Sequence, residues 1–308
     1  MNARLLRLVL GLACGLSLAG CSWSSSPQVQ FVAEWGTAGN GPGQFDQPIG
    51  VAVDAAGNVY VSDTGNNRIQ KFSPDGEFLV AFGSEGEGLD RPMHLAVDRN
   101  GLIFVPEFGK DRVSVFKADG SLQFFWGSSG TGDGELDAPT ALDCDRDGNV
   151  LVSEFYNHRI QVFDSKGSYI SQFGSEGHGF GQLYYPTDVS VDAEGNIDVA
   201  DAYNHRIQKF DSQGKPLRSW GQKGTGAGEF DVANAIAIDE KQRIHVVDFY
   251  NHRIQVFDHD GKFLLQFGAQ GTAPGQFERP TDIAIAADGS FHIADWGNNR
   301  IQKFRLKE

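Results

Sequence analysis

The chain has 308 residues, a formal net charge of −14 and a hydrophobic fraction of 40%. A chain of this length can hold two ordinary domains, but all-β propellers of similar length form a single unit. An acidic surface repels the phosphate backbone, so the composition excludes nucleic acid as an expected partner.

Residues 1–20 have the features of a bacterial lipoprotein signal peptide. Two arginines precede an uncharged apolar run from Leu8 to Leu18, which is too short to cross a bilayer. The following sequence, LAGC, resembles the lipobox, in which the cysteine is acylated after cleavage. We therefore expect lipidation at Cys21 and a short polar tether over residues 21–28. The alternative is an ordinary signal peptide or an uncleaved anchor, with a cysteine there by chance.

The residue after Cys21 is Ser22 rather than aspartate. By analogy with enteric lipoprotein sorting, this choice favours the outer membrane. We expect a cell-envelope protein that faces the periplasm and is held to the membrane by its N-terminal lipid. Because Cys14 leaves with the signal peptide, Cys144 remains as the one unmodified thiol, and no disulfide is expected in the mature domain.

From residue 29 onwards the chain consists of six copies of one unit. A recurring arginine marks the copies, which follow at intervals of 44, 47, 47, 47 and 47 residues: Arg68, Arg112, Arg159, Arg206, Arg253 and Arg300. The short interval arises because the loop from Gly83 to Pro92 is three residues shorter than its counterparts. A period of 40–50 residues is typical of propellers and solenoids.

Each copy contains four short segments with alternating hydrophobicity, separated by turns rich in Gly, Asn and Asp. In the third copy these segments are residues 139–144, 148–154, 159–164 and 168–174. Segments of this length and period predict strands rather than helices. Each copy is therefore expected to form a four-stranded blade.

The two ends of the chain predict how the ring closes. The last copy stops after its third strand, whereas Val29–Gly36 supplies an additional fourth-strand sequence before the first copy. A strand from the N-terminus that completes the last blade closes the ring and covers its edges. We predict one all-β domain over residues 29–308, a six-bladed propeller of four-stranded antiparallel blades. Pro106 interrupts the second strand of the second copy, where we expect a bulge.

The repeat sequence, for example GQFDQPIGVAVDAAGNVYVSDTGNNRIQKF, resembles the NHL repeat and recurs from Val29 to Leu306. NHL propellers include ubiquitin-ligase partners that bind RNA or protein, an amidating lyase that uses zinc, and bacterial secreted or lipid-anchored proteins. The resemblance implies a monomeric binding or assembly module. The ligase and RNA-binding branches are disfavoured because there is no RING-like cysteine cluster and the surface is acidic. The lyase branch implies several histidines at the channel mouth, where this chain has one.

Positions at which the six copies differ are candidates for function. Two residues after the recurring proline, near the expected mouth of the central channel, the copies carry Gly50, His94, Ala141, Asp188, Ala235 and Asp282. Asp143 lies one layer deeper. His94, Asp188, Asp282 and Asp143 could hold Zn²⁺, Mn²⁺ or Ca²⁺, which makes a metal-dependent hydrolase or lyase the alternative function. The other interpretation is that a water-filled channel tolerates polar side chains.

The links between the second and third strands carry seven aromatic residues, which we expect on the same face: Phe108, Phe155, Tyr156, Tyr203, Phe249, Tyr250 and Trp296. Exposed aromatic rings beside carboxylates suit a peptide, protein, sugar or cationic ligand. The alternative is that these rings pack beneath the glycine-rich loops. We favour a binding module whose partner is a protein, a peptide or a carbohydrate.

Two further features repeat in the copies and are therefore expected to be structural. An acid lies five residues before each recurring arginine: Asp63, Glu107, Glu154, Asp201, Asp248 and Asp295. A ring of six acids at the mouth is one interpretation, but a repeated buried ion pair explains six equivalent groups better. His158, His205 and His252 occupy a link position that is Asn67, Asp111 and Asn299 in the other copies. This replacement favours a capping role over catalysis.

Overall fold

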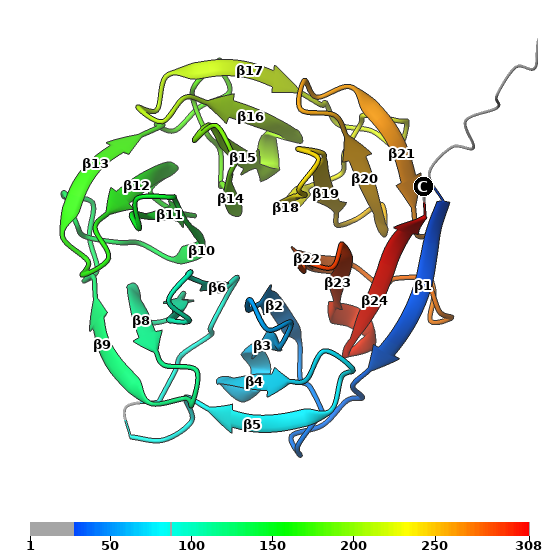
Figure 1. Ribbon diagram of the computed structural model, residues 1–308. Coiled ribbons are helices and arrows are strands. Elements are labelled where there is room, and N and C mark those ends of the chain that lie inside the picture. Colours follow the sequence, from blue (N-terminus) through cyan, green and yellow to red (C-terminus); the bar gives the residue numbers. More distant parts are fainter. Residues whose placement is uncertain (1–27, 87, 308) are drawn as a thin grey trace, which may run out of the picture.

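The computed structural model describes residues 28–86 and 88–307. Its strands form six four-stranded antiparallel sheets, arranged as the blades of a propeller around a central channel (Figure 1). The predicted all-β, six-bladed fold is thus confirmed. The predicted signal peptide and Cys21, the predicted lipidation site, lie outside the described residues. No helix within the described ranges has the length and apolar character needed to span a bilayer.

The strands repeat in a fixed order from the channel outwards. The innermost strands are β2 (Pro48–Val53), β6 (Ala96–Val97), β10 (Pro139–Cys144), β14 (Asp188–Val191), β18 (Ala233–Ile238) and β22 (Pro280–Ile285). The second strands are β3 (Val59–Asp63), β7 (Ile103–Glu107), β11 (Val150–Glu154), β15 (Ile197–Asp201), β19 (Ile244–Asp248) and β23 (Ser290–Asp295).

The third strands are β4 (Arg68–Phe72), β8 (Arg112–Phe116), β12 (Arg159–Phe163), β16 (Arg206–Phe210), β20 (Arg253–Phe257) and β24 (Arg300–Lys307). The outermost strands are β5 (Phe78–Phe82), β9 (Leu122–Trp126), β13 (Tyr169–Phe173), β17 (Pro216–Trp220), β21 (Phe263–Phe267) and β1 (Gln28–Trp35). Three of the links form short 3₁₀ turns, η1 (Thr64–Asn66), η2 (Ala202–Asn204) and η3 (Trp296–Asn298).

Blade 6 is built from both ends of the chain, in the order β1-β24-β23-β22. The antiparallel pairing runs from Gln28 opposite Lys307 to Trp35 opposite Ile301. The Phe31 ring meets Phe304 edge-on, with the ring centroids 5.7 Å apart. Strand β1 thus covers the outer edge of β24, which would otherwise offer unpaired backbone groups.

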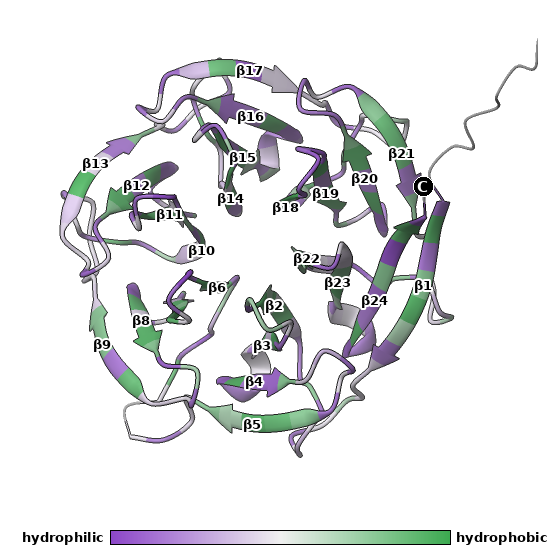
Figure 2. Cartoon of the chain, viewed as in Figure 1, coloured by the Kyte–Doolittle hydropathy of each residue, from purple (hydrophilic) through white to green (hydrophobic). Residues whose placement is uncertain are grey.

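The apolar core lies between and within the blades. The last phenylalanine of each third strand is at most 4% exposed: Phe72, Phe116, Phe163, Phe210, Phe257 and Phe304. Figure 2 shows hydrophobic residues recurring along the strands, whereas the connecting loops are mostly hydrophilic. This alternation follows from the period-two arrangement of side chains on a strand.

The recurring arginine forms hydrogen bonds with the loop that precedes the innermost strand of its blade. In blade 5, Arg253 Nε donates to Asp248 at 2.8 Å, and the rest of the guanidinium donates to the backbone carbonyls of Thr225, Gly226 and Glu229. All six blades contain this acid–arginine pair at 2.7–2.8 Å. All six acids are fully buried, so they form structural ion pairs rather than an open ring.

A second repeated contact joins each blade to the next. The residue before each third strand has a positive φ of 49–54°, a region that Asn, Asp and His adopt more readily than other residues: Asn67, Asp111, His158, His205, His252 and Asn299. Its side chain accepts a hydrogen bond from a backbone N–H of the next blade, at 2.8–3.1 Å. The three histidines therefore link blades through Nδ1.

Blade 2 departs from the pattern in its innermost strand. Strand β7 pairs with β8 without a register shift, with Pro106 opposite Val113. On its inner side, Pro92 opposes Glu107 whereas Ala96 opposes Phe104, so the register shifts by one residue beside His94. Other blades show a comparable shift, so Pro106 is not its cause. Strand β6 is only two residues long. The Pro106 carbonyl accepts from the Met93 N–H at 3.0 Å, so its nitrogen also faces the inner strand. Because proline has no N–H, it cannot extend the β6–β7 ladder at this point.

Candidate functional site

The loops that precede the innermost strands lie on one face of the propeller, which we call the loop face. The links between second and third strands lie on the same face, because they bond directly to these loops. For example, the Gly65 N–H donates to the Asp46 carbonyl at 2.8 Å, and the Tyr250 N–H donates to the Asp231 carbonyl at 3.0 Å. The link residues therefore surround the mouth of the channel.

Three tyrosines project from these links on adjacent blades 3, 4 and 5. Tyr156, Tyr203 and Tyr250 are 52%, 47% and 48% exposed, which is unusual for rings of this size. The other three blades carry glycine at this position, and there the loop is too close for a side chain. A Cβ on Gly297 would lie 2.7 Å from the Glu278 carbonyl oxygen. Tyrosine thus stands in three copies at a position where the others have glycine, and packing of the blades does not require its side chain.

The preceding residue in each link lies nearer the channel and is half-buried in Phe108, Phe155, Phe249 and Trp296. These rings meet the tyrosines or one another. Ring centroids are 6.0 Å apart for Phe108 and Tyr156, and 6.4 Å apart for Phe249 and Trp296. The structure brings the seven predicted aromatics to one face, and we call this set the aromatic arc.

Four residues of this surface were missed from the sequence. The Tyr185 ring packs at a tilt against Phe155, with the ring centroids 4.7 Å apart, and Tyr184 lies beside it. The guanidinium of Arg91 lies 4.8 Å from the centre of the Phe108 ring, and that of Arg279 lies 5.7 Å from the Tyr250 ring. Arg91, Tyr185 and Arg279 each precede the recurring proline, a position that varies between the copies and could have revealed them.

A cavity of about 310 Å³ opens inside the aromatic arc, and Phe249 and Trp296 line it. We call it the mouth cavity. Its other walls come mainly from the residue after each recurring proline: Ile49, Met93, Thr140, Thr187, Asn234 and Thr281. The hydroxyls of Thr140, Thr187 and Thr281 donate to carbonyls of the next blade at 2.8–3.2 Å. The hydroxyl hydrogens of these threonines are therefore used in contacts between blades. Their oxygens can still accept hydrogen bonds from a ligand in the mouth cavity.

His94 lies at the inner end of the mouth cavity, beside two carboxylates. Its Nδ1 is 3.9 Å from Oδ1 of Asp188 and 3.9 Å from Oδ1 of Asp282. All three residues are 5% exposed, and Nδ1 has no hydrogen-bond partner. The three alternate blades thus converge as the sequence suggested, and we call this group the acid–histidine triangle.

The aspartates also hold the innermost strands together. Asp282 accepts from the Val51 N–H at 2.8 Å, and Asp188 accepts from the Ile236 N–H at 2.7 Å. Asp143 accepts from the Val191 N–H in the same way at 2.9 Å. Each carboxylate therefore bridges to the following blade. Asp143 lies outside the triangle, whose ligand atoms all lie within 4.8 Å of one another.

The carboxylates face away from the aromatic arc. They line a second cavity of about 230 Å³, the lower channel, which reaches the distal ends of the inner strands at Val53 and Ile285. His94 lines both cavities, whereas Asp188 and Asp282 line only the lower channel. No Lys or Arg is present among the described residues that line either cavity. His94, Asp188 and Asp282 were expected near the channel mouth, and of these three only His94 lines the mouth cavity.

Burial governs the ionisation of this group. It raises the pKa of Asp282 to about 7, against the opposing attraction of His94, and it raises the pKa of Asp143 to about 6. Burial lowers the pKa of His94, but the carboxylates of Asp282 and Asp188 outweigh it, so the net shift is upward. Asp282 and Asp143 therefore bind a proton more readily than carboxyl groups in water do.

The donor set of the triangle is compatible with a divalent cation. An ion centred among the three atoms would lie no more than about 2.5 Å from each, close to the bond lengths of Ca²⁺ and longer than those of Zn²⁺. Zn²⁺, Mn²⁺ and Ca²⁺ therefore remain candidates, with His94, Asp188 and Asp282 as the residues that would hold the ion. Asp143 would remain a neighbouring charge.

Replacing Asp143 with asparagine is expected to change how stability depends on pH. The folded pKa of about 6 exceeds the ordinary value of about 4. Protonation therefore favours the folded state, and this contribution is complete below about pH 4 and lost as the pH rises through 6. The unfolding free energy of the wild type should fall relative to that of Asp143→Asn between these limits. Parallel pH profiles in denaturant titrations would contradict this assignment.

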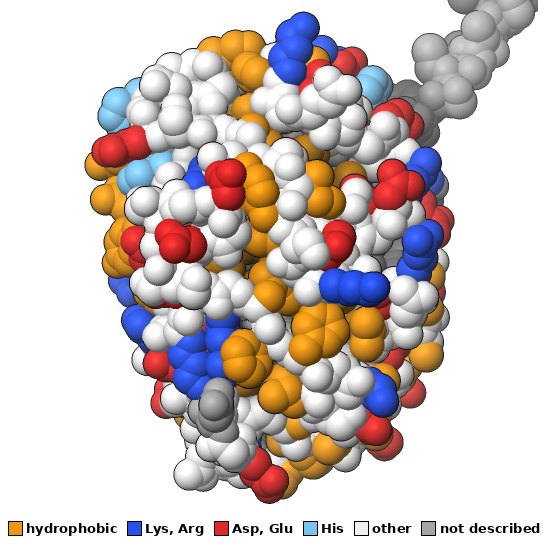
Figure 3. All heavy atoms as spheres, turned by 90° about the vertical axis from the view of Figure 1, so that its left-hand side faces the viewer, with side chains coloured by type: hydrophobic (Ala, Val, Ile, Leu, Met, Phe, Trp, Pro, Cys, Tyr) orange, Lys and Arg blue, Asp and Glu red, His pale blue; other side chains and the backbone are white. Residues whose placement is uncertain are grey.

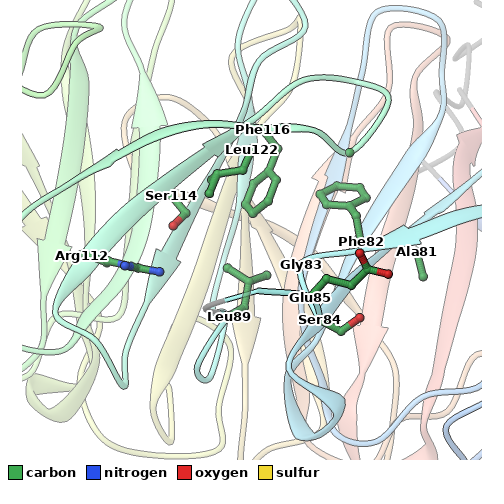
Figure 4. Close-up of a pocket in the computed structure, with 12 residues that line it drawn as sticks. Ala81, Phe82, Gly83, Ser84, Glu85, Leu89, Arg112, Ser114, Phe116 and Leu122 are labelled. Carbon is green, nitrogen blue, oxygen red and sulfur yellow. The ribbon is translucent and has the colours of Figure 1, made fainter.

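Another cavity, of about 330 Å³, lies between blades 1 and 2 beside the shortened loop that joins them (Figure 4). Ser114 stands where the other blades have glutamine, and its hydroxyl donates to Glu107 at 2.5 Å. In Figure 4, Ser114 and Arg112 lie on one side of the cavity, and Phe82, Ser84 and Glu85 lie on the other. The smaller side chain and shorter loop leave space that the other blades fill.

The outer wall exposes large hydrophobic residues on every blade, including Leu79, Leu122, Ile170, Leu217 and Leu264. Figure 3 shows such side chains on one side of the wall, interspersed with acidic and basic groups. Because they are distributed around the circumference rather than gathered, they form a weaker candidate for a binding site than the aromatic arc.

Comparison with known families agrees with the fold. The NHL repeat matches residues 45–72, 136–163 and 183–210. A family described as a 6-bladed beta-propeller matches residues 240–308.

Curated relatives are similar over about one repeat. The protein brain tumor of Drosophila melanogaster is 42% identical over 57 residues, which is 18% of this chain and 6% of the relative. NHL repeat-containing protein 3 of Homo sapiens is 47% identical over 55 residues, which is 17% of this chain and 16% of the relative. The chain thus matches only a small part of each relative's length.

Solved structures share the fold at low sequence identity. A protein of unknown function from Bacteroides thetaiotaomicron has a TM-score of 0.72 at 19% identity, covering 92% of this chain and 76% of the other. A gluconolactonase from Xanthomonas campestris has a TM-score of 0.67 at 16% identity, covering 86% and 88%. Virginiamycin B lyase from Staphylococcus aureus has a TM-score of 0.62 at 16% identity, covering 92% and 100%.

Proposed function

This chain is an NHL-repeat protein with a six-bladed propeller fold, and we propose that it is a binding or assembly module whose loop face holds a protein or peptide. The observation that carries the proposal is the aromatic arc with its two flanking arginines. Tyr, Trp and Arg are the residue types that contribute most to binding at protein interfaces. Their presence at positions where the repeat otherwise has small or varied residues supports selection for contact rather than for packing. A carbohydrate, which also stacks on aromatic rings, is the other ligand class that the arc suits.

Tyr250→Ala and Trp296→Ala are expected to lose the partner while keeping the fold. Tyr250 is 48% exposed, so its removal leaves little cavity, but it removes a ring that can contribute about 2 kcal/mol or more to binding. Affinity for a partner captured by the wild type should therefore fall roughly thirtyfold. The measurement is titration calorimetry with that partner, alongside thermal melting of each variant.

Leu217→Ala is the matched control, because Leu217 is also 48% exposed but lies on the outer wall. It should bind as the wild type does. A partner that tolerates both loop-face variants and is lost with Leu217→Ala would overturn the proposal. Panels of oligosaccharides and peptides, tested with the same variants, distinguish the ligand classes.

The module is held to the cell envelope by a lipid on Cys21 and faces the periplasm from the outer membrane. The sequence LAGC after an apolar run supports this anchor, and Ser22 supports the outer membrane. In cell fractionation, the wild type should remain in the outer-membrane fraction, and Cys21→Ala should leave it. Mass spectrometry of the wild-type N-terminus should show acyl chains on Cys21. An unmodified Cys21, or an identical distribution of the two proteins, would refute the anchor.

A metal-dependent hydrolase or lyase is the second candidate function, and the acid–histidine triangle favours it. Such an ion supplies Lewis acidity when bound, and His94, Asp188 and Asp282 would hold it. Elemental analysis of the untagged mature domain should then show near-stoichiometric metal. His94→Ala and Asp188→Ala should both lose it. A wild type without metal after soaking with divalent ions would remove this candidate.

A further inference from the structure

We propose that the lower channel binds a primary alkylammonium group, with the ammonium at Asp188 and Asp282 and the alkyl chain along the aliphatic wall. This site is separate from the aromatic arc and goes beyond the loop-face function. It opens towards the opposite end of the inner strands, where Val53 and Ile285 line the cavity. The propeller would then have two binding sites, one at each end of its channel.

Charge is the first observation that supports the site. Three carboxylates line the lower channel, from Asp143, Asp188 and Asp282, together with one imidazole and no Lys or Arg among the described lining residues. Buried carboxylates are costly unless they are compensated, and these three accept backbone N–H groups of the following blades, with the His94 imidazole as the one group beside them that can carry a positive charge. One imidazole for three carboxylates leaves a place for a further positive charge, which a ligand can supply.

The unpartnered nitrogen of His94 is the second, independent observation. His94 is 5% exposed, and its Nδ1 is directed towards both carboxylates without a hydrogen bond to either. A second cation bound beside His94 opposes protonation of the imidazole, and in the neutral ring that carries its proton on Nε2, Nδ1 is an acceptor. Three acceptors then converge on one point, matching the three N–H donors of an ammonium group.

The spacing of these acceptors lies between the values expected around an ammonium and around a zinc ion. Three acceptors at ordinary hydrogen-bond length around an ammonium are about 4.6 Å apart, whereas two ligands of a tetrahedral zinc are about 3.4 Å apart. The triangle has two separations of 3.9 Å, and all its ligand atoms lie within 4.8 Å of one another. The two 3.9 Å separations would widen by about 0.7 Å around an ammonium and shorten by about 0.5 Å around zinc, so the triangle can take an ammonium after a small adjustment.

The remaining wall explains why the ligand should be an alkyl amine rather than a hydrated cation. It is formed by small and aliphatic side chains, including Ala52, Ala96, Ala237 and Ala284. A chain of methylene groups can contact this surface, and its burial is favourable. A lysine side chain of a partner protein and a free aliphatic amine both present this chemistry.

The test is a titration of the mature domain with n-butylammonium, followed by NMR of the methyl groups of Ala, Val, Leu and Ile. Saturable shifts are expected at the lower channel, and 1-butanol, the uncharged analogue, should produce none. Asp188→Asn and Asp282→Asn keep a backbone acceptor but remove the charge, and each should weaken binding roughly tenfold to a hundredfold. Parallel titrations with 1,4-diaminobutane and Nα-acetyl-lysine amide show whether the free amine or the lysine side chain binds more tightly.

Asp145→Asn is the matched control, because Asp145 holds the β10–β11 turn and does not line the channel. It should bind n-butylammonium as the wild type does. If the channel aspartate variants do not fold, Ala284→Leu blocks the wall without changing the charge and should abolish binding. Equal shifts with 1-butanol, undiminished binding by folded Asp188→Asn, or a divalent ion that n-butylammonium cannot displace would overturn the proposal. Each of these results leaves the partner-binding assay at the aromatic arc unaffected.

Discussion

Asp248→Ala is expected to destabilise the propeller by about 3–5 kcal/mol, the cost of removing one partner from a buried ion pair. Asp248 is fully buried and accepts hydrogen bonds from Arg253, Asn251, Gln255 and the Asp231 N–H, at 2.8–3.1 Å. Alanine would leave all of these donors without their acceptor. Chemical denaturation with urea gives the change in unfolding free energy directly.

Asp260→Ala is the control for this prediction. Asp260 pairs with Arg218 at 2.8 Å, but the two side chains are 52% and 45% exposed. Exposed ion pairs contribute about 0–1 kcal/mol, because water and salt screen them. A loss below 1 kcal/mol for Asp248→Ala, similar to that of the control, would contradict the assignment of the acid–arginine pairs as structural contacts.

Removing β1 is expected to abolish the monomeric fold. A chain that begins at Gly36 loses the ladder with β24 and the Phe31 ring against Phe304. It also loses the ion pair of Glu34 with Arg300 at 2.9 Å. Phe31 is partly buried against the core of this blade, and losing the ladder, the ring contact and the ion pair together is expected to be comparable with the 5–15 kcal/mol that stabilises a whole domain.

The control is a chain that begins at Gln28 and keeps β1. Size-exclusion chromatography and thermal melting should show a folded monomer for this chain and an unfolded or self-associated protein for the shorter one, because the exposed edge of β24 can pair with other chains. A folded monomer with an unchanged melting temperature after the deletion would contradict the closure mechanism.

The blade architecture could be predicted because the same sequence pattern occurs six times in the chain. Strands such as β10 (Pro139–Cys144) and β12 (Arg159–Phe163) begin at the predicted residues, and the strand predicted from Val29 closes the ring as β1. One short apolar segment is ambiguous between helix and strand, but six equivalent segments with the same pattern indicate a strand. Blade 2 was harder to predict, because Pro106 limits the length of the neighbouring strand β6, whereas its own strand β7 pairs regularly with β8.

The candidate site was predicted in part. Counting from the recurring proline brought His94, Asp188 and Asp282 to one level of the channel, because equivalent positions in a propeller meet near its axis. The same counting could not show that His94 lies between two cavities, since that depends on side-chain direction. Arg279 and Tyr185 were missed because their contacts with the aromatic arc cross between blades, whereas Arg91 was missed although it contacts Phe108 of its own blade.

The two ends of the channel have different chemistry, although the strands around them repeat. The loop face presents exposed rings and arginines, and the opposite end presents carboxylates on an aliphatic wall. The repeated residues, such as the acid–arginine pairs, hold the blades and loops in place. Residues that depart from the repeat give each end its surface, and variants of the exposed ones, such as Tyr156, Tyr203 and Tyr250, should change binding more than stability.

The most direct test of the central claim is photo-cross-linking in living cells, with a benzophenone amino acid at position 250 or at position 217. Both sites are 48% exposed, but only position 250 lies in the aromatic arc. A discrete adduct from position 250 and none from position 217 is the result that a loop-face binding module predicts. Adducts from position 217 alone would place the partner on the outer wall and contradict the proposed function.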